Sequence, residues 1–276
     1  MDGTFLFGLG TGLSAGVVIA PLLAVAARTG RFALLRPVLV AVGATFAFFL
    51  VLDAVLESGS RQPTVRTLGI LTGVLSLLAA GLITWAVFEI HRGARHRTYG
   101  PAVRPLYAGV VVAAAALSVG LGGLGQAQFV RAAARAATGE EADLLPLLGV
   151  VLGVATGAVV ALALFHGLLG IRPDRWFFTG TAVLLAVVGA GVLAQGVGNL
   201  QFADVFGGDR TPVYDVYSEV PLDTWYGMAL TSTVGFSPFP TALQVTVWFL
   251  YAVPVLLLLL APIRFGRSVG GAGAKE

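Results

Sequence analysis

Seven long apolar runs, joined by polar connections, constrain this chain more than any other feature. We place them at about residues 3–27, 37–56, 67–90, 106–130, 145–169, 176–198 and 242–261. A hydrocarbon layer roughly 30 Å thick is crossed by a helix of about 20 apolar residues. Because the backbone must satisfy its own hydrogen bonds in lipid, runs of this length predict helices rather than barrel strands. The sequence therefore predicts an all-α integral membrane protein with seven transmembrane helices, forming a single transmembrane domain over 1–276.

The composition agrees with lipid as the main solvent of the protein surface. Hydrophobic residues make up 57% of the chain and charged residues 11%, whereas a soluble domain is about 25% charged. Cysteine is absent, which excludes disulfides, thiolate-bound metals and iron–sulfur clusters. We expect no bound cofactor. A pI near 9.6 would suggest nucleic acid for a soluble protein, but the basic residues here divide by membrane side, so no nucleic-acid partner is expected.

Charged residues orient the predicted helices. Twelve of the 17 basic residues follow the first, third, fifth and seventh runs, and 11 of the 14 acidic residues lie on the opposite side. The positive-inside rule then places the C-terminus in the cytoplasm and the N-terminus outside a plasma membrane. The tail 262–276 is therefore cytoplasmic, and the acidic stretch 199–241 is an external loop. That loop is either solvated, with an interfacial aromatic belt, or a surface that collects cations or receives a partner.

Glycines recur every four residues in several runs, which places them on one helix face. The stripes are Gly8, Gly12 and Gly16 in the first run, Gly69 and Gly73 in the third, and Gly149, Gly153 and Gly157 in the fifth. Small residues at this spacing let helix backbones approach closely, which is how helices pack in lipid. The stripes therefore predict close helix–helix contacts.

Two glycine-rich stretches, FLFGLGTGLSAG (5–16) and GLGGLGQAQF (120–129), lie in runs that cross in opposite directions. GLGGLG also fits a dinucleotide-binding pattern, but it lacks the preceding strand that this motif needs. The matching positions predict an inverted repeat of three plus three helices, about 3–90 and 106–198, followed by a seventh helix. Glycine-interrupted helices at corresponding positions of inverted repeats point to a transport site near the membrane midplane.

The chain resembles the oxidase-dependent iron permeases, specifically the bacterial EfeU-type permeases, over nearly its whole length. The similar stretches are GLSAGVVIAPLLAVAARTGR from residue 12, LITWAVFEIHR (82–92), LLGVVLGVATGAVVALAL (147–164) and VTVWFLYAVPVLLLLLAP (245–262). The resemblance implies a multi-pass permease that moves iron ions across the plasma membrane. It also implies an extracytoplasmic oxidase or peroxidase that delivers the iron.

The Arg-Glu-Gly-Leu-Glu hallmark of that family has lost its charges here. The first copy reads Gly10-Thr11-Gly12-Leu13-Ser14, and the second reads Leu121-Gly122-Gly123-Leu124-Gly125, followed by Gln126. By resemblance these positions line the transport path, and two further family glutamates would fall at Thr72 and Gln244. Gln195 is another polar residue inside a run, which either forms an interhelical hydrogen bond or lines a neutral path.

The lost carboxylates leave three functions open. Hard cations prefer carboxylate oxygen, and Thr11 and Ser14 keep the shared i, i+3 face while offering only neutral hydroxyls. The chain is then an iron permease, a permease-fold transporter of a less charged solute, or a non-transporting subunit that assembles with a membrane complex. No nucleophile–base pair or phosphate loop is evident, so no enzymatic activity is expected.

Overall fold

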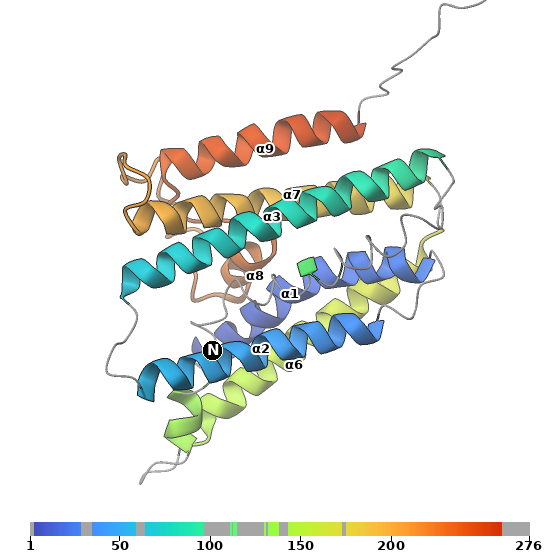
Figure 1. Cartoon of the computed structure of the whole chain (residues 1–276). Coiled ribbons are helices and arrows are strands. Elements are labelled where there is room, and N and C mark those ends of the chain that lie inside the picture. The colour runs from blue at the N-terminus through green and yellow to red at the C-terminus, as the bar shows by residue number, and fades with distance from the viewer. Residues whose placement is uncertain are drawn as a thin grey trace, which may run out of the picture.

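The computed structural model describes residues 3–28, 35–58, 64–96, 111, 113–114, 130, 132–137, 143–172 and 175–260. The elements named within these ranges are all helices (Figure 1). They are α1 (Gly3–Arg28), α2 (Leu35–Ser58), α3 (Val65–His96), α6 (Leu145–Gly170), α7 (Arg175–Phe202), α8 (Trp225–Val234) and α9 (Ala242–Leu260). The longer helices lie alongside one another, and the short α8 sits among them next to α1 and α7.

Six of the seven predicted runs coincide with a helix, and the ends differ by a few residues. Most of the fourth run lies outside the described residues. The residues of this run that the structure describes, 111, 113–114 and 130, are helical. Five helices, α1, α3, α6, α7 and α9, each contain a segment that is long and apolar enough to cross a membrane. The protein is therefore an all-helical, multi-pass membrane protein.

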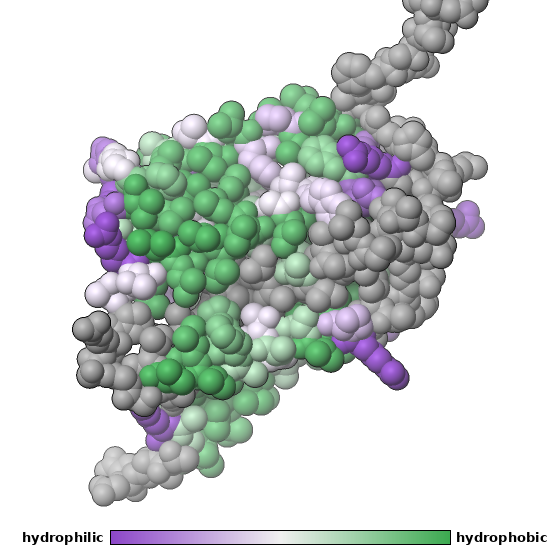
Figure 2. Space-filling view, in the orientation of Figure 1, coloured by the Kyte–Doolittle hydropathy of each residue, from purple (hydrophilic) through white to green (hydrophobic). Residues whose placement is uncertain are grey.

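On the face that Figure 2 shows, the described residues are mostly apolar across the middle of the helices. On α6, Val159 is 63% exposed, and on α9, Leu250 is 72% exposed. Of its 26 residues, α6 buries Val150, Gly153 and Gly157. A helix that exposes this much apolar surface is stable only where the solvent is lipid.

Neighbouring helices pack in defined relative directions. The first turn of α1 contacts the first turns of α6, so these two helices are parallel, whereas Gly73 of α3 contacts Leu200 near the far end of α7. The largest apolar cluster joins the C-terminal halves of α1, α3 and α9 to the N-terminal halves of α2 and α7. A chain that crosses the membrane alternately produces this arrangement.

Residues 199–241, predicted as a loop, contain a helix that the sequence did not predict. Thr224 is the N-cap of α8, since its hydroxyl accepts a hydrogen bond from the Gly227 N–H at 3.2 Å. The helix ends at Gly235, whose φ of 68° is left-handed and favours glycine. Because α8 packs against α1 and α7, this connection is in part a component of the bundle.

Candidate functional site

The glycine stripes of α1 and α6 form one interlocked contact, which confirms the predicted packing. A Cβ on Gly157 would lie 2.7 Å from the Gly12 Cα, and one on Gly16 would lie 2.6 Å from the Ala161 Cβ. A Cβ on Gly153 would lie 2.6 Å from the Leu9 nitrogen. The backbones therefore meet directly, and the first motif stretch is held at this contact.

Arg28 joins the other ends of the same two helices. Its guanidinium donates a hydrogen bond to the Leu169 carbonyl and another, of 2.7 Å, to the Ile171 carbonyl. Carbonyls at a helix C-terminus carry partial negative charge and lack partners within the helix. The arginine therefore caps α6 and fixes its register against α1.

The motif-equivalent residues of α1 have different environments. Gly10 is buried, and a Cβ there would lie 2.7 Å from Met228 Sδ and 2.9 Å from Ser232 Oγ, both on α8. Thr11 Oγ1 donates to the Phe7 carbonyl at 3.0 Å. Thr11 and Gly12 border an apolar groove of about 740 Å³ between α1, α2 and α6.

The other hydroxyls predicted for the path also bond to their own helices. Ser14 Oγ donates to the Thr11 carbonyl at 3.1 Å, and Thr72 Oγ1 donates to the Leu68 carbonyl at 2.9 Å. Leu13 is buried, with 7% of its surface exposed. These bonds satisfy the hydroxyl donors without help from another helix. The second motif copy, Gly122, Gly123, Leu124, Gly125 and Gln126, lies outside the described residues.

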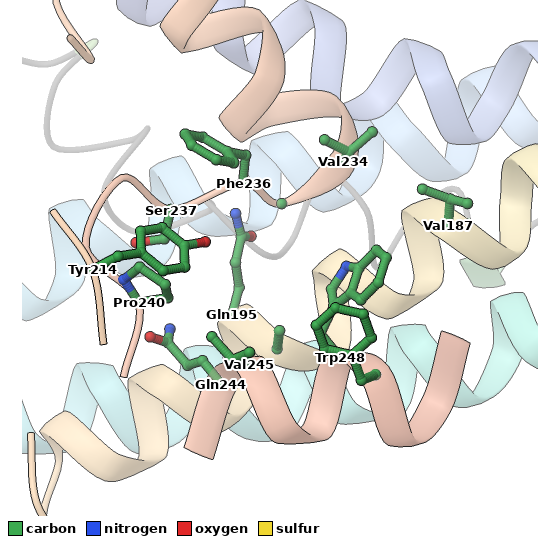
Figure 3. Close-up of a pocket in the computed structure, with 13 residues that line it drawn as sticks. Val187, Gln195, Tyr214, Val234, Phe236, Ser237, Pro240, Gln244, Val245 and Trp248 are labelled. Carbon is green, nitrogen blue, oxygen red and sulfur yellow. The ribbon is translucent and has the colours of Figure 1, made fainter. Parts of the chain in front are cut away.

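Two predicted path residues, Gln195 and Gln244, line one pocket of about 320 Å³ between α7, the end of α8 and the start of α9 (Figure 3). Gln195 Nε2 donates to the Thr231 carbonyl of α8 at 3.2 Å. This bond is the interhelical hydrogen bond that the sequence offered as one alternative. Gln195 also lines the pocket, so the second alternative, that it lines a neutral polar path, stays a prediction.

Gln244 has a further role that was missed from the sequence. Its side-chain oxygen accepts from the Thr241 N–H at 2.9 Å, and Thr241 Oγ1 accepts from the Gln244 N–H at 3.3 Å. This is a capping box, and the Thr-x-x-Gln spacing at the start of an apolar run was the available signal. The Thr241 hydroxyl also donates to Gln201 Oε1 at 2.8 Å, which ties the start of α9 to α7.

The C-terminal end of α8 forms one wall of this pocket. The Gly235 N–H caps the Leu230 carbonyl, and Phe236 N–H donates to the same oxygen at 3.4 Å. A Cβ on Gly191 of α7 would lie 2.8 Å from the Gly235 nitrogen. Only a glycine at 191 lets the end of α8 approach α7 this closely.

Tyr214, Ser237 and Trp248 line the same pocket and were not predicted as site residues. The available signal was the Gly-Phe-Ser-Pro-Phe-Pro run from Gly235, since glycine followed by prolines ends a helix. It predicts a short helix that stops before the seventh run.

The polar segment between α7 and α8 contains carboxylates that bond locally. Asp209 Oδ2 accepts from the Thr211 hydroxyl at 2.7 Å, and its Oδ1 accepts from the Thr211 N–H at 2.9 Å. These two hydrogen bonds lower the pKa of Asp209 from its ordinary value of 3.8. Asp204 pairs with Arg210. Among the described residues, no group of three or more His, Asp or Glu side chains is placed to hold a metal ion.

Comparison with known proteins gives a consistent result. A family model described as the iron permease FTR1 family matches residues 1–269. The ferrous iron permease EfeU of Escherichia coli O6:K15:H31 (strain 536 / UPEC) is 24% identical over 273 residues, which are 96% of this chain and 97% of that relative. The ferrous iron permease EfeU of Shigella flexneri is 25% identical over 205 residues, which are 71% of this chain and 85% of that relative. No solved structure matches the chain significantly.

Proposed function

We propose that this chain, which belongs to the iron permease FTR1 family, carries iron ions across the plasma membrane through the interior of its helix bundle. The observation that carries the proposal is the family match over residues 1–269, which includes every helix described above. The apolar surface and the five membrane-length helices supply the setting that a permease needs. We further propose that the chain is a transporter without enzymatic activity.

We propose seven crossings, with an inverted repeat over about 3–90 and 106–198 and the N-terminus outside. The parallel contact of α1 with α6 and the antiparallel contact of α3 with α7 support alternate crossing. The charge count along the chain supports the orientation. The connection 199–241 would then lie on the outer side, where we propose that it receives an extracytoplasmic partner protein.

We propose the ferrous ion as the cargo, because this chain has lost the carboxylates that favour a ferric ion. The free energy of removing an ion from water rises steeply with its charge, so neutral oxygens compensate a divalent ion better than a trivalent one. Thr11 and Ser14 supply hydroxyl oxygen where the family motif has glutamate. The name ferrous iron permease, which the relatives carry, supports the same choice.

Metal flux into reconstituted vesicles tests this function. Purified chain is incorporated into liposomes, and uptake of ferrous iron, ferric iron, manganese and zinc is measured against empty liposomes. We expect ferrous uptake to be the fastest of the four. The chain should also restore growth at low iron in a bacterial strain without iron permeases. Absence of both flux and rescue, with the protein shown to be in the membrane, removes the iron assignment.

A second candidate function, transport of a less charged solute, has its own support. Thr11 and Ser14 bond to their own helix, and the described residues offer no acidic cluster for a metal. Replacing both residues by glutamate discriminates between the candidates. The double variant should increase iron flux if iron is the cargo, and it should reduce transport of a neutral cargo. A stable membrane partner with no flux of any solute would instead indicate a non-transporting subunit.

A further inference from the structure

We propose that the apolar groove between α1, α2 and α6 binds one acyl chain of an anionic phospholipid, whose phosphate is held by Arg36 and Arg172. The binding itself does not depend on iron transport. Its place in the cytoplasmic leaflet rests on the orientation proposed above, in which both arginines lie on the inner side.

The groove is present because α2 lies apart from the two helices beside it. Glycines interlock α1 with α6, whereas α2 makes no extensive contact with either of them in the part of the chain that the structure describes. A Cβ on Gly43 of α2 would meet nothing within 4 Å. Gly43 and Ala158, on opposite walls of the groove, are both exposed. The groove therefore opens at the surface of the bundle, where the solvent is lipid.

The groove has the length and the chemistry of one lipid chain. On α6 it runs from Val154 to His166, and on α1 it runs from Thr11 to Leu23. Twelve residues of helix at 1.5 Å each span about 18 Å, slightly more than half of a hydrocarbon layer roughly 30 Å thick. Its walls are apolar apart from Thr11 and His166, and the Thr11 hydroxyl is bonded to its own helix. An acyl chain of one leaflet fits this space.

Basic side chains lie at one end of the groove. Arg36 precedes Leu39, which lines the groove, by three residues, so the two share a face of α2. Arg172 follows the end of α6, and both arginines are exposed. A guanidinium binds a phosphate through paired N–H donors. Basic pockets between transmembrane helices on the cytoplasmic side bind anionic lipid head groups, and this end of the groove has that composition.

This end of the groove lies at the level of the membrane–water interface. The ends of α1 and α6 and the starts of α2 and α7 lie at the same end of the bundle (Figure 1). Trp176, at the start of α7, is 81% exposed, as expected for an aromatic side chain in an interfacial belt. His166 lines the groove here, and its Nδ1 donates to the Leu162 carbonyl at 2.8 Å. The other ring nitrogen, Nε2, is therefore left for a polar group of the lipid.

Charge favours a lipid over a second copy of the chain as the occupant. Copies of a membrane protein share one orientation, so a second copy would bring its own arginines to the same end of the groove. Like charges that face each other oppose association, whereas a phosphate neutralises the pair. The groove should therefore prefer an anionic lipid to a zwitterionic lipid with the same acyl chains.

Quenching by brominated lipids tests the site, because the chain contains no cysteine and a single introduced one can be labelled. Gly43→Cys is labelled with bimane and reconstituted in phosphatidylcholine vesicles that contain increasing fractions of brominated phosphatidylglycerol or brominated phosphatidylcholine. We expect phosphatidylglycerol to quench at a mole fraction lower by roughly tenfold or more, since each arginine contributes roughly fivefold. Arg36→Gln combined with Arg172→Gln should remove the preference. Gly81→Cys on α3 is the matched control, because Gly81 is exposed with nothing within 4 Å of a Cβ, and both lipids should quench it equally.

A second reporter, Ala158→Cys on the α6 wall of the groove, decides the question if Gly43→Cys does not fold or its label fills the groove. Equal quenching of both reporters by the two lipids would overturn the proposal. Protection of both reporters from either lipid, together with a dimer found by light scattering, would overturn it and assign the groove to a second copy. A preference for phosphatidylglycerol without metal flux leaves the lipid site standing and removes the permease assignment. Iron flux without that preference does the opposite.

Discussion

A substitution at Gly153 should affect the packing of α6 strongly, because few residues of this helix are buried. Along α6, only Val150, Gly153 and Gly157 are buried. A Cβ on Gly153 would lie 2.6 Å from the backbone nitrogen of Leu9 and closer still to the carbonyl oxygen of Phe5. Both neighbours are backbone atoms of α1 and cannot rotate away, so Gly153→Ala has to separate the two helices.

The size of the effect follows from that separation. Moving a Cβ from 2.6 Å to an ordinary contact of about 3.5 Å opens the interface by roughly 1 Å, which removes a quarter to a half of the dispersion energy of each contact. Overpacking of this kind costs about 1–3 kcal/mol. We expect the steric clash to cost about 2–3 kcal/mol, apart from any gain in helix propensity, and to lower the Tm by about 5–10 °C relative to a variant without the clash.

Gly167→Ala is the matched control, because it lies on the same helix and a Cβ there meets nothing within 4 Å. Both variants gain the same helix propensity, about 1 kcal/mol, so their difference isolates the steric effect. Thermal unfolding of purified protein in one detergent, followed by tryptophan fluorescence, measures it. Equal Tm values for the two variants would refute a packing role for the glycine contact.

Three further predictions concern side-chain hydrogen bonds. The Thr84–Tyr251 bond of 2.7 Å joins α3 to α9, so a Thr84→Val, Tyr251→Phe double-mutant cycle should give a coupling of about 0.6–1.7 kcal/mol in thermal or denaturant unfolding. Thr241→Ala removes the α9 cap and should cost about 1–2 kcal/mol, with faster hydrogen exchange in the first turn of α9. The turn at Asp209 should persist as pH falls below 3.8 and be lost as pH passes through the lowered pKa. Thr211→Val should move the carboxyl titration, followed by NMR, back toward 3.8.

Controls for these changes come from hydroxyls of the same type on exposed faces. Thr156 and Thr246 both donate to a carbonyl of their own helix and are exposed. Their alanine variants should change stability by less than about 0.5 kcal/mol. Losses equal to that of Thr241→Ala would contradict the capping role. An unchanged Asp209 titration in Thr211→Val would contradict the assigned cause of its pKa.

The membrane makes much of this fold predictable from the sequence. A helix in lipid must be long, apolar and internally bonded, so the runs that became α1, α6 and α9 are visible by hydropathy alone. Glycine spacing likewise predicts which faces approach closely. It does not predict which helices pair, because the stripe of α1 would fit any other small-residue face. The choice of α6 as the partner of α1 comes from the structure.

The site was less predictable, because its residues are ordinary in type and lie on separate elements. With ten residues, α8 is too short to cross a membrane and gives no hydropathy signal. Gln195 and Gln244 were recognised as polar residues in apolar runs. Their roles depend on α8, since Gln195 bonds to Thr231, and on the local cap at Thr241. The Thr-x-x-Gln spacing indicates the cap, but composition and periodicity contain no information about the contact between Gln195 and Thr231.

The neutral residues of the first motif stretch and the position of α8 are related by packing at Gly10. Gly10, which by resemblance corresponds to the arginine of the family motif, faces Met228 and Ser232 at distances that leave no room for a long side chain. An arginine there would be buried against α8, and its charge would need the two glutamates as partners. With Thr11 and Ser14 in place of glutamates, such an arginine would be an unpaired buried charge, whereas the neutral Gly10 needs no partner. The neutral residues at positions 10, 11 and 14 are therefore compatible with one another, and the absence of a side chain at Gly10 lets α8 pack closely against α1.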